Sequence, residues 1–460
     1  MTPSAVSSFK SNEQKRHSTL DARDVSLPSP YYAVPLHKYY TMPLLLSVIS
    51  MSLSVWGAAP VSAFVSAAAS SSSATALRSA SYSAEWINLQ SLDSSPGQIQ
   101  PPRSGANTVS CGGKILTFAG YAEEIDAATS AVERYVVNDL WEFEPYQAET
   151  SEWGWKQRIA DSHDECPGPR LAFAMTGSPS SSKAFVLGGW DPQVPGTGGI
   201  ILDDVAMLNS DSLTWSKPTD KEGKLSAIPD GPTSRHVAVA ISDDTIILHN
   251  HRCVDHVLLM QTLDEEQNKV QWVRQKTSGE TPSSRGLHCA AAISSPSSDG
   301  TNMCIFGGAA QSGLMSNESF VLDTTSWKWT KIDCGENAPA PRAGACLCAL
   351  DDKSVLLFGG ATPTEGSLLG LNDVWVLHVD DLNTGKGRWE CLIEHQSVNS
   401  DSSSTLPPGR NAATLTEIDA KKMIPGNVAE EGDKCYLLQG GWAPFKKTYN
   451  DVFVLRISSK

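Results

Sequence analysis

Residues 342–377 read RAGACLCALDDKSVLLFGGATPTEGSLLGLNDVWVL, and this stretch decides the fold. Arg342 stands before one run that can form a strand, and a second, apolar run ends in the pair Gly359-Gly360. A third run begins after Asn372-Asp373, and Trp389 follows where a fourth strand would lie. Short apolar runs bounded by glycine and turn residues are typical of β-strands buried on both faces. The stretch therefore predicts a small antiparallel sheet.

The same order of residues returns six times along the chain. Each copy begins with an arginine near a proline or glycine turn: Arg103, Arg170, Arg235, Arg285, Arg342 and Arg410. In five copies the second apolar run ends in a Gly-Gly-like pair. The third copy is degenerate, because His249-Asn250-His251 stands where the glycines should be. Such periodic self-similarity indicates the architecture before any single residue can suggest an activity.

The tryptophans that close the copies set the size of the repeat. Trp155, Trp215, Trp272, Trp329 and Trp389 follow one another at intervals of 57 or 60 residues. The sixth copy has no closing tryptophan, but Ala84-Glu85-Trp86-Ile87 precedes the first copy and can supply the missing strand. We expect this strand to pair with the last copy and close a ring, which leaves only short, protected strand edges.

An arginine, a Gly-Gly pair, an Asn-Asp turn and a tryptophan in this order resemble the kelch repeat. The resemblance implies an all-β fold, a six-bladed kelch-type β-propeller over residues 84–460. Its blades would be four-stranded and antiparallel, with an N-terminal strand in the last blade. A kelch blade of four short strands needs roughly 50 residues, so these blades carry modest loop insertions. The resemblance also implies function, since kelch propellers commonly bind protein partners on a loop face.

Strand direction predicts which face that is. In an antiparallel blade the start of strand one and the end of strand two lie on the same face. The six arginines therefore share a face with the loops after the glycine pairs, which are about residues 121–137, 190–201, 309–317, 361–371 and 442–449. Variable loops on a rigid scaffold are where binding usually occurs. The arginines have two open interpretations: a bond that maintains each repeat, or a ring of guanidinium donors for a carboxylate-rich protein partner.

Net charge argues against two classes of partner, although it leaves room for a local basic patch. The net charge is −15, and residues 1–84 carry six Lys/Arg and three Asp/Glu, so the remainder carries −15 − 3 = −18. Nucleic acids and anionic membranes require concentrated positive charge, which argues against both as partners of the propeller. The ten cysteines include no Cys-x-x-Cys pair, and an even count does not show disulfides in a domain of this size.

The first 83 residues are expected to direct localisation. Residues 1–41 are polar without a period and predict a disordered leader. Residues 42–63 contain an uncharged apolar run and end in Val61-Ser62-Ala63, which is typical of a signal peptide, and the run is short for a membrane span. Residues 64–83 form a Ser/Ala-rich linker without acids. The Ala63-Phe64 junction before this tract resembles a bipartite plastid presequence, so we expect delivery to a plastid through the secretory route. A secreted or endomembrane protein and a signal anchor are the alternatives.

The degenerate copy contains the weak candidates for metal binding. His249, His251 and Cys253 would project to one side of an extended strand, and both histidine and cysteine can bind transition metals. Their spacing matches no zinc motif, and a drifted repeat is the alternative. No local catalytic or phosphate-binding motif occurs, so the sequence predicts no cofactor and favours a protein-interaction scaffold. A propeller enzyme acting on a small molecule in the central pocket is the competing hypothesis.

Overall fold

The computed structural model describes residues 82–460 with short gaps at 93–96, 126–128, 148, 150, 159–164, 178–179, 193–197, 265–267, 295–299, 399–404 and 427. The expected leader 1–41, the signal-like segment 42–63 and the linker up to residue 81 lie outside the described residues. Tyr82 and Ser83, which the sequence placed in the linker, already belong to the first strand. Among the described residues, no helix combines the length and the apolarity needed to cross a membrane.

Six antiparallel sheets form the blades, as the sequence predicted. The first three blades contain these strands: β3 (Asn107–Cys111), β4 (Lys114–Ile125), β5 (Val132–Gln147) and β6 (Glu152–Arg158) in blade 1, with β2 (Arg103–Ser104) added beside β4; β7 (Ala174–Gly177), β8 (Lys183–Asp191), β9 (Ile200–Asn209) and β10 (Thr214–Ser216) in blade 2; β11 (Val237–Ala240), β12 (Thr245–His249), β13 (His256–Asp264) and β14 (Lys269–Lys276) in blade 3.

The remaining three blades repeat this arrangement. They contain the following strands: β16 (Cys289–Ser294), β17 (Thr301–Phe306), β18 (Ser319–Asp323) and β19 (Lys328–Ile332) in blade 4, with β15 (Ser278–Gly279) parallel to β19; β20 (Cys346–Asp351), β21 (Ser354–Phe358), β24 (Val374–Asp381) and β25 (Lys386–Ile393) in blade 5; β26 (Thr414–Ile418), β27 (Lys434–Gln439), β30 (Val452–Ser459) and β1 (Tyr82–Asn88) in blade 6. The described helices are short: η2 (Leu89–Ser91) and α1 (Ala420–Met423).

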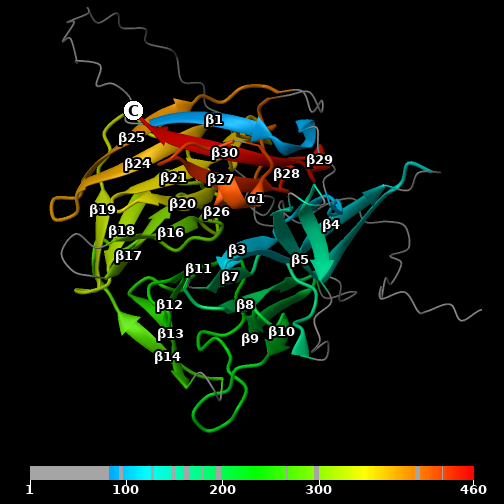
Figure 1. Ribbon diagram of the computed structural model, residues 1–460. Helices are drawn as coiled ribbons and strands as arrows, with labels where there is room; N and C mark the ends of the chain where they lie inside the picture. Colours follow the sequence, from blue (N-terminus) through cyan, green and yellow to red (C-terminus); the bar gives the residue numbers. More distant parts are fainter. Residues whose placement is uncertain are drawn as a thin grey trace, which may run out of the picture. The chain divides into compact units, whose positions relative to one another are not determined.

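The ring closes where the sequence placed the closure. Strand β1 pairs antiparallel with β30, with Trp86 opposite Leu455, and Figure 1 shows the two strands side by side in blue and red. The first strands of neighbouring blades contact one another around the whole circle, from β3 through β7, β11, β16, β20 and β26 back to β3. Blade 6 is thus built from both ends of the described chain, and no blade is left with an open neighbour.

Six hydrophobic clusters lie between adjacent blades rather than within one central core. The closing tryptophans lie on the fourth strands, and several pack against an aromatic ring of the preceding blade. Trp86 meets Phe358 of blade 5 at a ring-centroid distance of 5.0 Å, and Trp389 meets Phe306 of blade 4 at the same distance. Tilted and edge-to-face aromatic pairs add to the burial of apolar area. These contacts explain why tryptophan recurs once per copy.

The glycine pairs join one blade to the next. At Gly359, a side chain would lie 2.9 Å from the carbonyl oxygen of Arg410, and the N–H of Gly360 donates to that same oxygen at 2.9 Å. Both glycines adopt positive φ, which residues with a side chain rarely do. The pair therefore provides the close approach between the second strand of one blade and the first strand of the next.

Several connections that the sequence placed in loops are β-ribbons. Strands β4 and β5 continue past the glycine position as a hairpin up to the pair Ile125 and Val132. Shorter ribbons form in the fifth and sixth blades: β22 (Ala361–Thr364) with β23 (Ser367–Gly370), and β28 (Trp442–Ala443) with β29 (Lys447–Thr448). We use the name loop face for the side of the propeller that carries the second-to-third-strand connections.

Candidate functional site

Five of the six arginines are buried and bound to an acid of their own blade. The guanidinium also donates to the carbonyl oxygen at the first glycine-like position, at 2.8–3.1 Å. The pairs, with Nη2-to-carboxylate distances of 2.7–2.9 Å, are Arg103–Asp139, Arg170–Asp204, Arg285–Glu318, Arg342–Asp373 and Arg410–Asp451. We call each pair an Arg–acid lock, because it ties the start of the first strand to the start of the third.

Arg342 shows how completely a lock uses its guanidinium. Its Nε donates to the carbonyl of Ala340, Nη1 to Gly359 and Asp373, and Nη2 to Asp373. Arg342 is 1% exposed and the Asp373 side chain 7%. A bidentate pair in such surroundings is strongly oriented. The geometry of these five arginines therefore fits the repeat-maintaining interpretation, and their donors point into their own blades.

Arg235 occupies a different position from the other five. In the other blades, the first-strand residue that pairs with the last strand-two residue before the Gly-Gly-like pair lies four positions after the arginine. In blade 4, for example, Cys289 pairs with Phe306 and follows Arg285 by four. In blade 3, Val237 pairs with His249 and follows Arg235 by only two. Thr233 therefore stands in the place of the lock arginine. Its carbonyl accepts a hydrogen bond from the N–H of Gly189, as the carbonyls of four lock arginines accept one from the second glycine of the preceding blade. Among the described residues, the Arg235 side chain has no recorded hydrogen bond or ion pair, and burial lowers its pKa.

Arg235 instead belongs to a ring of six backbone hydrogen bonds that encircles the propeller axis. One residue of each blade donates its N–H to the next member and accepts from the previous one, at 2.8–3.3 Å. All six have positive φ, between 51° and 66°. In bonding order they are Gly105, Ala412, Gly344, Leu287, Arg235 and Ala172. Arg235 thus brings a partly exposed, unpaired guanidinium to the start of the first strands, near the axis.

Most of the exposed large apolar side chains lie on the loop face. Of twelve large apolar side chains that are exposed among the described residues, eight lie on second-to-third-strand connections, and every blade contributes at least one. The most exposed is Leu314, at 76%. The eight are Ile125, Val132, Ile200, Ile201, Val254, Leu314, Leu369 and Phe445.

The histidines of the degenerate blade have separate environments. His249 Nδ1 shares a hydrogen bond of 3.0 Å with His288 Nε2, and its ring lies edge-on to Trp329 in the way that Phe306 meets Trp389. Burial lowers the pKa of His249 to about 3, so the ring is neutral at physiological pH. His251 is exposed. The structure therefore gives His249 a packing position equivalent to the aromatic residue of other blades.

One group of three side chains in the described part of the chain has the chemistry and proximity of a metal site. Ligand atoms of Asp230, Cys253 and His256 all lie within 4.8 Å of one another. This group shares only Cys253 with the three residues suggested by the sequence. Cys253 and His256 form a visible Cys-x-x-His pair, but Asp230 joins them only through the fold.

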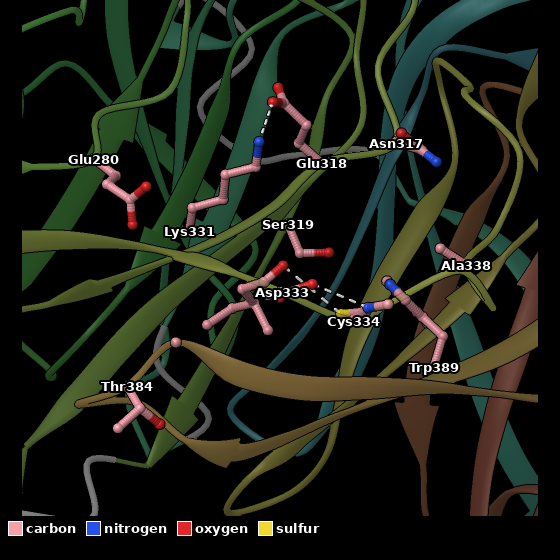
Figure 2. Close-up of a pocket in the computed structure, with 13 residues that line it drawn as sticks. Glu280, Asn317, Glu318, Ser319, Lys331, Asp333, Cys334, Ala338, Thr384 and Trp389 are labelled. Carbon is pink, nitrogen blue, oxygen red and sulfur yellow. Dashed lines mark hydrogen bonds and ion pairs between the residues drawn. The ribbon is translucent and has the colours of Figure 1, made fainter.

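An open pocket of about 440 Å³ lies between blades 4 and 5 (Figure 2). Its walls come from β18, β19 and β25, which are outer strands, so the pocket is peripheral and not axial. Lys331 Nζ donates to Glu318 at 2.8 Å, and Glu318 also accepts from Arg285. Burial opposes the charge on Glu318, but these hydrogen bonds outweigh it and lower its pKa to about 2. Lys331 and Glu318 are thus already paired, and this ion pair belongs to a lock.

Comparison with known proteins gives one family and several distant relatives. A family model for the KLHDC2/KLHL20/DRC7 Kelch-repeats domain matches residues 249–460. The host cell factor of Drosophila melanogaster is 29% identical over 64% of this chain and 16% of its own length. Human Kelch domain-containing protein 3 is 27% identical over 45% of this chain and 52% of its own length. The solved structure of YjhT covers 79% of this chain and 99% of its own, with 14% identity and a TM-score of 0.49.

The chain matches a minor part of the first relatives, including 28% of the length of the Arabidopsis thaliana acyl-CoA-binding domain-containing protein 4. The matched kelch domain covers the last three copies of the repeat and the second half of the third copy, and the six closed blades extend the same pattern to residue 82. Repeated sequence, closed ring and matched domain together identify this chain as a kelch-repeat β-propeller.

Proposed function

We propose that this propeller is a protein-interaction scaffold whose partner docks on the loop face. The observation that carries the proposal is the distribution of exposed apolar side chains: eight of the twelve among the described residues lie on second-to-third-strand connections, with at least one from each blade. Kelch-repeat propellers commonly mediate protein interactions, which supports the same class of function.

The scaffold under these connections is rigid, which favours tight binding. In five blades the connection begins beside a buried lock and ends at the acid of that lock. A pre-organised surface loses less conformational freedom when it binds. Arg235 adds one unpaired positive charge near the axis, suited to a carboxylate of the partner. We therefore expect the partner to present apolar side chains to the loop face and an acidic group toward Arg235.

Paired substitutions test the face. Leu314→Glu combined with Phe445→Glu places two charges on the loop face, where both residues are exposed. Leu263→Glu is the matched control, because Leu263 is also exposed but lies at the end of strand three, on the opposite face. Affinity capture from the source cells, followed by mass spectrometry, should find a partner with the wild type and the control that the double variant loses. Melting temperatures should be equal. A partner that the double variant retains and Leu263→Glu loses would contradict the proposal.

A further inference from the structure

Blade 3 lacks both members of the Arg–acid lock. Thr233 stands in the place of the arginine, as its hydrogen bond from Gly189 shows. The acid position is set by strand register. In blade 4, Ser319 lies opposite Phe306 and the lock acid directly precedes it. In blade 3, Leu258 lies opposite Leu248, and the same register places Val257 opposite His249. His256, which directly precedes Val257, therefore occupies the position of the lock acid. Blade 3 therefore has no Arg–acid lock between its first and third strands.

A different set of side chains meets at this place. Asp230 precedes Thr233 by three residues, His256 is the first residue of β13, and Cys253 lies in the connection before it. His256 Nε2 is 2.9 Å from Asp230 Oδ2, and the Cys253 sulfur lies within 4.8 Å of both ligand groups. Thiolate, imidazole and carboxylate are the three protein ligands that zinc accepts. The substituted positions of the lock thus hold a possible coordination set.

The surrounding groups orient these three side chains. Asp255 Oδ1 lies 2.9 Å from His256 Nδ1, an arrangement that directs Nε2 toward Asp230. Metal-bound histidines usually donate their other ring N–H to such a carboxylate. Arg274 Nε donates to Asp230 Oδ1 at 2.7 Å and leaves Oδ2 on the side of His256. Arg274 therefore positions the carboxylate and does not occupy the oxygen that faces the histidine.

The Cys253 thiol is buried beside the carboxylate and the imidazole of this set. It is 3% exposed, and its sulfur lies 3.6 Å from Asn250 Oδ1 and 3.9 Å from the Leu248 carbonyl oxygen. Burial raises the pKa of this thiol to about 12. The thiol is therefore neutral in the absence of a cation, and coordination to a metal ion would deprotonate it.

We propose that blade 3 binds one zinc ion through Asp230, Cys253 and His256, with the fourth position open to water or another ligand. Sulfur, nitrogen and oxygen ligands together suit zinc better than magnesium or calcium, which prefer oxygen alone. Binding releases the thiol proton and the proton held between His256 and Asp230. The ion joins the approach to strand one to the start of strand three, which is the connection that the lock makes in the other five blades.

The test uses the full chain and zinc or cobalt ions alone. After treatment with a chelator and its removal, equilibrium dialysis against micromolar zinc should give one zinc per chain. Cobalt at one equivalent should give a thiolate-to-cobalt charge-transfer band that zinc abolishes. Cys253→Ser should lose that band and His256→Asn should lose stoichiometric binding. Asp255→Asn should weaken zinc binding by about 10- to 100-fold, the usual effect of removing a carboxylate behind a histidine ligand.

His251→Asn and Cys334→Ser are the matched controls and should bind zinc like the wild type. Melting temperatures of the metal-free proteins identify any variant that does not fold, and Asp255→Asn, a change at an exposed residue, keeps the test available in that case. A wild type without stoichiometric zinc would overturn the proposal. So would a charge-transfer band that persists in Cys253→Ser, or zinc binding that is lost in His251→Asn.

Discussion

Arg342 and Arg235 look alike in the sequence, yet their guanidinium groups have different surroundings. Arg342 forms a lock, and its donors are taken up inside its blade. Arg235 lies two positions later in its copy, on the ring around the axis, without a recorded side-chain partner among the described residues. The sequence left two interpretations of the arginines open, and the structure favours a different one for Arg235 than for the other five. The five locks fit a structural purpose, and Arg235 is the arginine best placed to meet a partner.

Alanine substitutions should separate these purposes. Arg342→Ala leaves the buried Asp373 carboxylate without its partner, so we expect it to lower the free energy of unfolding by about 3–5 kcal/mol. Arg235→Ala breaks no ion pair and should cost less than about 1 kcal/mol while it weakens partner capture. Urea denaturation measures the first quantity and affinity capture the second. Equal losses of stability in both variants would show that Arg235 is also part of the framework.

The two-residue shift of Arg235 relative to the lock arginines could have been predicted from the sequence, but not from the arginine positions alone. Two residues after each lock arginine, the chain needs a positive φ, and the residues there include Gly105, Gly344 and Ala412. Two residues after Arg235 stands Val237, and a β-branched residue is strongly disfavoured in that conformation. The register therefore had to move, and Arg235 itself takes the positive φ of 60°. The site Asp230, Cys253 and His256 could not be found this way, because Asp230 meets the others only after folding.

Strands were easier to predict than the connections between them. Apolar runs such as 355–358, the glycine pairs and the tryptophan spacing all lie in the blade framework, where burial on both sides restricts the residues. Residues 121–137 were expected to form a loop, but most of them extend the hairpin of β4 and β5. The polar, acid-rich sequence of this segment did not indicate strands, because a ribbon outside the sheet core is not required to bury alternate side chains. Cross-strand bonds formed it without an apolar signal.

Strand β1 is the element whose loss should harm the ring most. Trp86 is buried and lies edge-on to Phe358 and Phe453, at centroid distances of 5.0 and 6.2 Å. We expect Trp86→Ala to lower the free energy of unfolding by about 3–5 kcal/mol, as is usual for a buried tryptophan. Trp442→Ala, on the half-exposed ribbon β28, is the control and should cost less.

Limited proteolysis checks that the effect arises at the closure. Trp86→Ala should expose the first described strand to cleavage before any other blade, because β1 pairs with one strand, β30, and is otherwise held by side-chain packing against the clusters on both sides of blade 6. Cleavage that begins instead in the connections of blades 2 to 4 would indicate that β1 contributes little to closure.

The propeller as a whole carries a large negative charge, −18 after the first 84 residues. Such a charge favours solubility and steers positively charged partners toward the surface, and it disfavours nucleic acids and anionic membranes. It says nothing about the compartment in which the protein works. That question depends on residues 1–81, which lie outside the described residues, so delivery to a plastid stays a prediction.

A reporter fusion tests this localisation. Residues 42–84 fused to a fluorescent protein should enter the plastid of an alga whose plastid derives from a red alga. Phe64→Ala in the same fusion is the matched control, because Ala63-Phe64 is the specific part of the resemblance. We expect the control to stay outside the plastid, in the endomembrane system. A wild-type fusion that is only secreted would refute the plastid prediction and favour the secretory alternative.

The pairing of β1 with β30 also imposes an order on biosynthesis. Glu85 and Arg456, which bond across this pair, are 371 residues apart, so the outer strand of blade 6 leaves the ribosome long before its partner exists. At translation rates of about 5–20 residues per second, that interval lasts roughly 20–75 s. During it, β1 is an unpaired edge next to whatever precedes it in the chain. The ring of a nascent propeller therefore cannot close until β30 has been synthesised, which leaves time for a chaperone or a translocation channel to bind the open chain.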